Sequence, residues 1–376
     1  MSVRRNIDIV FFDAASGHRS SAVALKKALD ERFKDLNVRA VNIVDIFDHY
    51  PTFGKIVHTG IRYFNWQIKN DIVFDLKGLI KLSIGIQDSA FTKGTHLVAK
   101  FWKDAPPDLV VSVTPMYNPV LFKSAQVANP AVKCVTIPVD FEEVMPRYWF
   151  TPAVEQYYLN ATPRLQLQAQ SARISENFLH QLGGMIADPD SYIQPQIDKK
   201  AELRKLKLDE NLPTGFVSFG GQGSTQVLKI AHAMVEQNIS ANVIFMCGKN
   251  EKLFKKLTAL QTPFKKAVFS YLQETPIHYL HLADFAIGKP GAMTITEALI
   301  TGTPLIAIKS RGMSPVQRGN EEWMIETRTG IVAENAAQVP VAITEILKSD
   351  VFTKNIEAHR HRAVFEAAEK IAQLID

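Results

Sequence analysis

Short apolar runs rich in β-branched residues alternate with helix-sized segments along most of this chain, and this alternation constrains the fold more than any other feature. The first half contains the runs IDIVFF, VRAVNIVD, DLVVSV and KCVTIPV. The second half contains TGFVSF, NVIFMC, KAVFSYL, DFAIGK and PLIAIK. Continuous apolar runs separated by helices are typical of parallel sheets that are covered by helices on both faces. We therefore predict an α/β protein with two doubly wound, Rossmann-like domains.

A segment between the two halves interrupts this pattern. Residues 182–213 read LGGMIADPDSYIQPQIDKKAELRKLKLDENLP, in which Gly, Pro and Asp break any continuous helix or strand. The chain has 376 residues, of which 46% are apolar, and this is enough to fill two cores. We expect one domain over residues 1–185 and a second from residue 186.

Charge, cysteine content and the N-terminal residues limit the cellular setting. A net charge of +5 suggests an anionic partner, but no basic block with interleaved aromatic residues is present, so nucleic acid is the least favoured. Cys134 and Cys247 lie in apolar runs, which predicts buried thiols rather than a disulfide or a metal site. The start of the chain lacks a signal-peptide pattern and no run is long enough to span a bilayer, so we expect a soluble, cytoplasmic protein.

Glycine-rich loops follow several apolar runs in the second half, where ligands bind in open parallel sheets. In SFGGQGS, Gly220, Gly221 and Gly223 have two interpretations. They allow an anion to approach the amides ahead of the next helix, or they allow tight packing of the loop. The loop lacks the GK[ST] ending of a P-loop and does not match a dinucleotide fingerprint cleanly.

The loop GKPGAMTITEAL is more informative. Pro290 and Gly291 predict a turn, and we expect Thr294 to cap or donate from the start of the following helix. We expect Glu297 in the first helical turn. A carboxylate there either interacts favourably with the helix dipole or accepts hydrogen bonds from the hydroxyls of a ribose.

Several motifs together resemble one family. The run GKPGAMTITEALITGTPLIAI, followed by SPVQRGNEEWMIETRTGIV, resembles the donor half of the monogalactosyldiacylglycerol synthases and the bacterial processive diacylglycerol glucosyltransferases. The motifs SGHRSSAVALKKAL, VDFEEVMPRYWF, LGGMIADPDSYIQP, LDENLPTGFVSFGGQGS and MCGKN also match in family order, so the resemblance spans nearly the whole chain.

The family consists of inverting glycosyltransferases of the GT-B fold, in which two Rossmann-like domains face a central cleft. It is related to the N-acetylglucosaminyltransferase that makes the peptidoglycan lipid intermediate. The resemblance implies an acceptor domain over residues 1–185, a UDP-sugar donor domain over 186–355, and a C-terminal helix over 356–376 that returns to the first domain. It also implies a hexosyltransferase that moves a hexose or N-acetylhexosamine from a UDP-sugar to a lipid acceptor such as diacylglycerol.

Donor-binding residues follow from the resemblance. It implies that uracil is read near Tyr271 and Leu272, and that Glu297 binds the ribose. It places the phosphates on the backbone of Gly291, Ala292, Met293 and Thr294, and brings Gln317 and Asn320 to the sugar or the diphosphate. The sequence has Arg318 where the family commonly has an acid after the glutamine. No metal-ligand cluster appears in these loops, so we predict no cofactor and no obligatory metal.

An inverting transfer needs a base near the acceptor hydroxyl, and histidine can take a proton near neutral pH. The family histidine corresponds to His18, which otherwise reads as a capping or hydrogen-bonded surface residue. Ala15 and Ser16 stand where the family usually has glycines. Asp140 matches an acidic residue of the acceptor-side loop, where it orients the base, binds the acceptor or forms a turn. The aromatic run at 148–150 lines an acceptor site or packs in the core.

Residues 51–103 mix Lys and Arg with Phe, Tyr, Trp and Ile at helical spacing. They form either a peripheral contact with an anionic membrane surface or ordinary amphipathic helices on a Rossmann core. Two other functions remain open at this point. One is a UDP-sugar epimerase or hydrolase of the same fold, and the other is a non-catalytic nucleotide-sugar binding protein.

Overall fold

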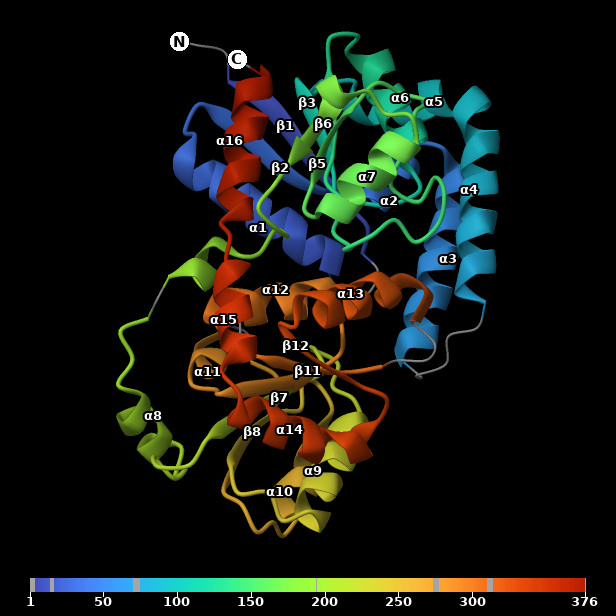
Figure 1. Ribbon diagram of the computed structural model, residues 1–376. Coiled ribbons are helices and arrows are strands. Elements are labelled where there is room, and N and C mark those ends of the chain that lie inside the picture. The colour runs from blue at the N-terminus through green and yellow to red at the C-terminus, as the bar shows by residue number, and fades with distance from the viewer. Residues whose placement is uncertain are drawn as a thin grey trace. The chain divides into compact units, whose positions relative to one another are not determined.

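A computed structural model describes residues 4–13, 17–69, 75–193, 195–272, 277–309 and 314–375. The chain divides into two compact units: unit 1 consists of residues 1–190 and 361–376, and unit 2 of residues 191–360 (Figure 1). Each unit contains a six-stranded sheet, and all paired strands run parallel. The prediction of two doubly wound α/β domains is therefore confirmed. Ala15 and Ser16 lie outside the described residues.

The sheet of unit 1 has the strand order β2-β1-β3-β4-β5-β6. Its strands are β1 (Arg5–Phe11), β2 (Leu36–Asn42), β3 (Leu109–Ser112), β4 (Lys133–Thr136), β5 (Tyr157–Asn160) and β6 (Leu179–Gln181). Its α-helices are α1 (Gly17–Arg32), α2 (Ile43–Phe47), α3 (Pro51–Lys69), α4 (Leu76–Lys93), α5 (Thr95–Val98), α6 (Asn118–Ala128), α7 (Pro163–Ser171) and α16 (Ala363–Ile375). The last helix, α16, packs against α1.

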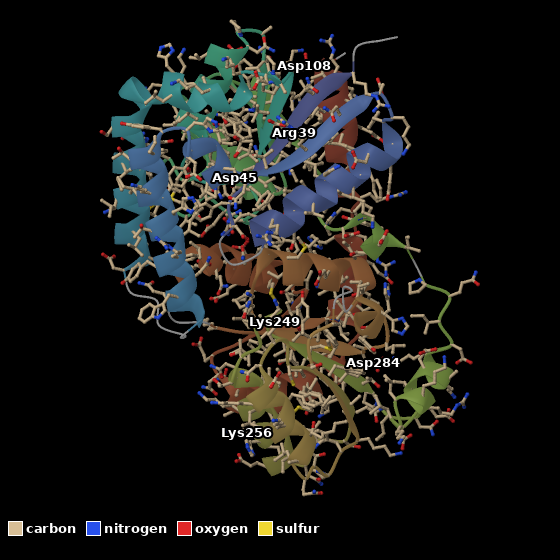
Figure 2. The ribbon with its side chains drawn as sticks, turned by 180° about the vertical axis from the view of Figure 1, so that it is seen from behind. Arg39, Asp45, Asp108, Lys249, Lys256 and Asp284 are labelled. Carbon is tan, nitrogen blue, oxygen red and sulfur yellow. The ribbon has the colours of Figure 1, made fainter. Side chains whose placement is uncertain are left out.

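Strand β1 shows why its last five residues, 7–11, are almost all apolar: all five are buried. Asp8 is the polar residue among them, and it is fully buried. Arg39 of β2 (labelled in Figure 2) donates to its two carboxylate oxygens at 2.7 and 2.8 Å, and the Trp102 indole donates at 2.7 Å. A buried charge is tolerated because it is paired and hydrogen-bonded.

The sheet of unit 2 has the strand order β12-β11-β10-β7-β8-β9. Its strands are β7 (Thr214–Ser218), β8 (Asn242–Met246), β9 (Lys266–Phe269), β10 (Phe285–Gly288), β11 (Leu305–Ile308) and β12 (Gly330–Ala333). Its α-helices are α8 (Lys199–Lys205), α9 (Gln226–Glu236), α10 (Glu251–Ala259), α11 (Ile277–His281), α12 (Ala292–Thr301), α13 (Ser314–Thr327), α14 (Val339–Lys348) and α15 (Val351–Ala358).

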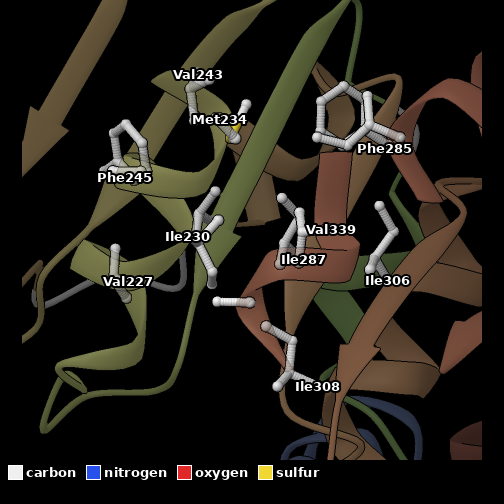
Figure 3. Packing of buried hydrophobic residues seen from close by; sticks show 14 of the residues in the cluster. Val227, Ile230, Met234, Val243, Phe245, Phe285, Ile287, Ile306, Ile308 and Val339 are labelled. Carbon is white, nitrogen blue, oxygen red and sulfur yellow. The ribbon is translucent and has the colours of Figure 1, made fainter. Parts of the chain in front are cut away.

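Helix α9 illustrates how this unit closes its core. Val227, Ile230 and Met234 follow helical spacing, and all three are fully buried. Figure 3 shows them with Val339 of α14 around the side chains of β8, β10 and β11. Cys247 is also buried, as is Cys134 in unit 1, and both thiols are free, as the sequence predicted.

Both sheets contain a topological switch point, where the connections that leave two neighbouring strands lead in opposite directions along the sheet. In unit 1 the switch point lies between β1 and β3, and in unit 2 between β7 and β10. Ligands of doubly wound sheets bind outside the carboxyl ends of the strands at such points.

Candidate active site

His18 lies at the switch point of unit 1. It is the second residue of α1, which follows β1, and its Nδ1 atom is 2.8 Å from the carbonyl oxygen of Val113, directly after β3. Because a carbonyl oxygen only accepts, Nδ1 must carry the proton, which leaves the lone pair on Nε2. His18 is therefore presented as the tautomer that a general base requires.

The surroundings of His18 are apolar and aromatic. The centroids of the Phe12 and Trp149 rings lie 6.3 and 6.2 Å from the centroid of the imidazole. Burial lowers the pKa of His18 to about 4, and the hydrogen bond to Val113 opposes this shift. The imidazole is consequently neutral at pH 7 and able to accept a proton.

Asp140 joins the same cluster through an aromatic residue. Its Oδ2 atom accepts a hydrogen bond of 3.1 Å from the Trp149 indole, the ring that faces His18. Burial raises the pKa of Asp140 to about 7; the indole N–H opposes this shift, and the charge of Glu142 adds to it. Within the described residues no hydrogen bond links Asp140 to His18, so any effect of Asp140 on the base passes through Trp149.

The aromatic run that follows Asp140 belongs to the core. Tyr148, Trp149 and Phe150 expose 7%, 0% and 1% of their surface, which supports the core alternative over an acceptor lining. The connection that Trp149 makes between Asp140 and His18 was not predicted from the sequence. Its position in the run VDFEEVMPRYWF was the only available signal.

In unit 2, the glycine-rich loop after β7 interlocks with the loop after β8. Gly223 has a φ of +70°, and a Cβ atom there would lie 2.0 Å from the Cys247 carbonyl oxygen. Gly248 has a φ of +55°, and a Cβ there would lie 2.5 Å from the Gly221 oxygen. The Lys249 amide donates to that same oxygen at 2.9 Å. These contacts support the packing interpretation for Gly223, and donor binding by this loop stays a prediction.

The start of α9 does not offer the free amides that the sequence suggested for an anion. The amide of Gln226 donates to the Ser224 hydroxyl, and the amides of Val227 and Leu228 donate to the carbonyls of Ser224 and Thr225. The loop thus satisfies its own helix start. Gly220 differs, because the nearest atom to its missing side chain is the Lys289 ammonium nitrogen, at 3.9 Å.

The start of α12 has the opposite character. Gly291 is the N-cap residue and no side chain caps the helix, so the expectation that Thr294 caps it is wrong. The first intrahelical bond runs from the Ile295 amide to the Gly291 carbonyl. In the described parts of the chain, nothing accepts from the amides of residues 292–294. Three N–H groups at the positive end of a ten-residue helix therefore remain available to an anion.

Glu297 is the sixth residue of α12, so it lies in the second helical turn rather than in the first. The correction follows from the helix start at Ala292, one residue after the Pro290–Gly291 turn. The helix-dipole explanation for this carboxylate loses force, because that effect is confined to the first turn. Ribose binding by Glu297 stays a prediction.

Lys289, directly after β10, is a candidate residue that the sequence interpretation missed. Burial lowers the pKa of its ammonium group, and within the described residues no carboxylate forms an ion pair with it. The only sequence signal was a lysine between a strand and a helix start. Its place beside Gly220 and the α12 amides makes it a candidate phosphate ligand.

Tyr271 and Leu272 lie after β9. Tyr271 is 47% exposed, and the Lys249 ammonium lies 4.8 Å from the centroid of its ring. A Cβ atom added to Gly221 would lie 3.4 Å from this ring. Figure 2 labels Lys249 in the loop between β8 and α10. Three loops of unit 2 thus meet at Gly221. That their backbone reads uracil stays a prediction.

Two residues of α13 were expected to reach the sugar or the diphosphate. Asn320 is 2% exposed and donates to the Pro290 carbonyl at 2.9 Å, so it braces the turn before α12. Gln317 is 7% exposed, and its Oε1 atom has no partner among the described residues. Arg318 points to solvent and pairs with Glu322 one turn later. Of the three, Gln317 retains the clearest capacity to bind a ligand.

Two features of the described residues bear on cofactors and membranes. No group of three or more His, Cys, Asp or Glu side chains is arranged to hold a metal ion. None of the helices that the structure describes is both long enough and apolar enough to cross a membrane. The absence of a metal requirement stays a prediction.

Comparisons with known proteins agree with this arrangement. Residues 216–374 match the glycosyltransferase family 28 C-terminal domain. The chain is 24% identical to monogalactosyldiacylglycerol synthase 1 of Arabidopsis thaliana over 393 residues, covering 99% of this chain and 71% of that protein. It is 28% identical to the processive diacylglycerol beta-glucosyltransferase of Staphylococcus saprophyticus over 312 residues, covering 80% and 75%. Two further plant synthases are covered over 65% and 63% of their length, so the chain spans only part of these relatives.

Among solved structures, MurG of Acinetobacter baumannii superposes with a TM-score of 0.62 and 13% identity, covering 98% of this chain and 99% of that chain. The fold and the matched domain define a glycosyltransferase of the GT-B class. Within that class, the chain is similar in sequence to the monogalactosyldiacylglycerol synthases and the processive diacylglycerol glucosyltransferases, in agreement with the resemblance of the motifs.

Proposed function

We propose that the protein is an inverting glycosyltransferase that moves a hexose or N-acetylhexosamine from a UDP-sugar to a lipid acceptor such as diacylglycerol. The observation that carries this proposal is the cationic, uncapped helix start at the switch point of unit 2. Three amides of α12 that have no acceptor among the described residues, together with the Lys289 ammonium, fit the two negative charges on the diphosphate of a UDP-sugar. Glu297 and Gln317 supply acceptors for the hydroxyls of the ribose and the sugar.

His18 acts as the general base in this proposal. Its Nε2 atom takes the proton of the acceptor hydroxyl while that oxygen attacks the anomeric carbon on the face opposite the nucleotide. The bonding electrons of the breaking C–O bond pass to UDP, whose growing charge is stabilised by Lys289 and the α12 amides. Asp140 holds the Trp149 indole against His18 and thereby orients the base. One attack from the opposite face inverts the anomeric configuration.

The lipid acceptor requires access to a membrane, and the surface of α3 and α4 offers it. Ile56, Tyr63, Trp66 and Leu82 expose 43%, 45%, 55% and 60% of their surface. Exposed basic residues of the same helices accompany them: Lys55, Arg62, Lys77 and Lys81. Apolar side chains surrounded by basic ones suit a peripheral contact with an anionic membrane surface.

Product analysis tests the proposal. The purified chain is incubated with UDP-glucose, UDP-galactose or UDP-N-acetylglucosamine, with and without diacylglycerol vesicles, and the lipid and aqueous products are identified. We expect a glycolipid and UDP only when both substrates are present. Free or isomerised sugar formed without lipid would identify a hydrolase or epimerase instead. UDP binding without any turnover would identify a nucleotide-sugar binding protein.

A further inference from the structure

The loop after β4 holds Trp149 between Asp140 and His18, and the hold depends on a carboxylate inside the loop. The Glu143 side chain accepts hydrogen bonds from the backbone amides of Trp149 and Phe150, at 3.3 and 3.1 Å. The backbone amides of Arg147 and Tyr148 also favour the charged form of this carboxylate. The amides of Trp149 and Phe150 thus share one carboxylate oxygen as their acceptor.

The backbone of Glu143 is itself fixed by α7. Its amide donates to the Gln168 side-chain oxygen at 2.7 Å, and the Gln168 amide group donates back to the Glu143 carbonyl at 3.4 Å. Burial raises the pKa of Glu143 to about 6, and the four amides oppose this shift. The carboxylate is therefore largely ionised at pH 7 and binds the amides in its charged form, where such bonds are strongest.

A second contact holds the same segment from outside. Arg147 has a φ of +69°, a left-handed conformation that is unfavourable for a residue with a side chain. Its guanidinium forms a two-pronged ion pair with Asp88 of α4, with one bond of 3.0 Å. Strained backbone of this kind persists only where its surroundings impose it.

We propose that Glu143 is a positioning residue for the His18–Asp140 pair: together with Asp88, it holds residues 147–150 so that the Trp149 indole contacts both. The importance of this role for catalysis rests on the proposed function, in which His18 is the base. The geometric part does not, because it concerns only the hydrogen bond between Trp149 and Asp140.

Loss of Glu143 has a predictable effect on Asp140. The groups that act on this carboxyl are the Trp149 N–H, the charge of Glu142, which pairs with Arg164, and the buried Tyr148. Of these, the indole N–H lowers the pKa of Asp140. If Trp149 moves away, the pKa of Asp140 rises and the indole no longer responds to its ionisation.

The decisive experiment follows the Trp149 indole by NMR in protein labelled with ¹⁵N-tryptophan, which has four indole signals. The signal lost in Trp149→Phe belongs to Trp149. In the parent we expect this signal to titrate near pH 7, the range of the Asp140 pKa. In Glu143→Gln we expect that titration to disappear or to move to higher pH while the other three signals stay in place. The exposed, matched variant Glu155→Gln should behave like the parent. An unchanged Trp149 titration in folded Glu143→Gln would overturn the proposal.

Kinetics then test the link to catalysis. We expect Glu143→Gln to lower kcat by roughly 10- to 100-fold, as small misplacements of catalytic groups do, with little change in KM for the UDP-sugar. The double variant Glu143→Gln/Trp149→Phe should be no slower than Trp149→Phe alone, since both changes act on the same contact. If the two substitutions lower kcat independently, so that the double variant is slower than Trp149→Phe by the full factor of Glu143→Gln, the proposal is overturned.

If Glu143→Gln does not fold, Asp88→Asn provides a second test. Asp88 is exposed, so we expect its substitution to leave the fold intact. We expect it to shift the Trp149 titration in the same direction by a smaller amount, and no shift would remove Asp88 from the proposal. If the chain transfers no sugar, the NMR result still decides whether Glu143 positions Trp149. If transfer is intact and the titration is unchanged, only this inference fails.

Discussion

The switch points of units 1 and 2 share a topology but differ in chemistry. In unit 1 the position between β1 and β3 holds an imidazole, an indole and a carboxyl group. In unit 2 the position between β7 and β10 holds a lysine and the α12 amides, which have no acceptor in the described part of the chain. The comparison shows that strand order decides where a site lies, while the residues directly after the strands decide what it can do.

The difference extends to protonation. At the unit 1 site, burial favours the neutral form of His18, which suits a base, and raises the pKa of Asp140 to about 7. At the unit 2 site, burial also lowers the pKa of Lys289, yet a bound diphosphate would restore its charge. Burial therefore prepares a base in one unit and a phosphate ligand in the other.

The largest expected effect comes from removing the base. We expect His18→Ala to lower kcat by about 10²- to 10⁴-fold, the usual contribution of general acid–base catalysis. The affinity for UDP should stay near that of the parent, because the proposed UDP ligands belong to unit 2. Steady-state kinetics and calorimetry with UDP measure the two quantities. Folded His18→Ala that transfers sugar at the parental rate would remove this role and favour the binding-protein alternative.

Asp140→Asn should stabilise unit 1 at high pH. Because folding raises the pKa of Asp140 from 3.8 to about 7, the native state favours the protonated form, and stability falls as the pH rises between these values. Asparagine keeps an acceptor for Trp149 but carries no charge. We expect a gain of roughly 2 to 4 kcal/mol at pH 8 that shrinks toward zero near pH 4, measured by urea unfolding.

The same variant should be less active, since a charged carboxylate no longer orients the indole. In the parent, kcat should fall as the pH drops through about 7, where Asp140 gains its proton. In Asp140→Asn the residual activity should persist down to about pH 4, where His18 becomes charged. If kcat falls at the same low pH in both proteins, the ionisation of Asp140 does not affect the reaction.

Lys289→Met tests the chemistry of the unit 2 site. Loss of hydrogen bonds to a charged phosphate should weaken UDP binding by roughly 10- to 100-fold. Lys256→Met is the matched control, because Lys256 is exposed on α10 (Figure 2) and should leave the affinity unchanged. Calorimetry at two salt concentrations measures both variants. If both variants bind UDP with equal affinity, Lys289 is not a ligand of the diphosphate.

The smallest expected effect concerns the surface of unit 1. Replacing one basic residue near an anionic membrane should weaken vesicle binding about 5-fold, since each contributes about 1 kcal/mol. We expect this for Lys81→Ala in sedimentation with anionic vesicles, with less binding at high salt. Val341→Ser, on the exposed face of α14 in unit 2, serves as the control. Equal binding to neutral and anionic vesicles would contradict the electrostatic contact.

Sequence reasoning predicted the strands β1 to β4 and β7 to β11 and missed β5, β6 and β12. Strands β5, β6 and β12 have four, three and four residues, and β6 reads LHQ, too short and too polar for a periodic signal. The run VRAVNIVD was expected to be a single strand, but Asn42 accepts from the Val44 amide and begins α2. An asparagine cap is a local signal, yet it competes with the strand preference of the β-branched residues beside it.

The sequence by itself determined the α/β class, the two domains, the similarity to one group of glycosyltransferases and the loops that could carry chemistry, because apolar periodicity and ordered motifs are properties of the chain. Only the tertiary structure decided which loop amides are free. The first turn of α9 is satisfied by Ser224 and Thr225, whereas the start of α12 has no cap. It also decided the tautomer of His18 and the indole link to Asp140, since these depend on groups 95 and 9 residues apart in the chain. The partner of the His18 imidazole and the burial of both groups arise from packing between segments, and no local pattern encodes them.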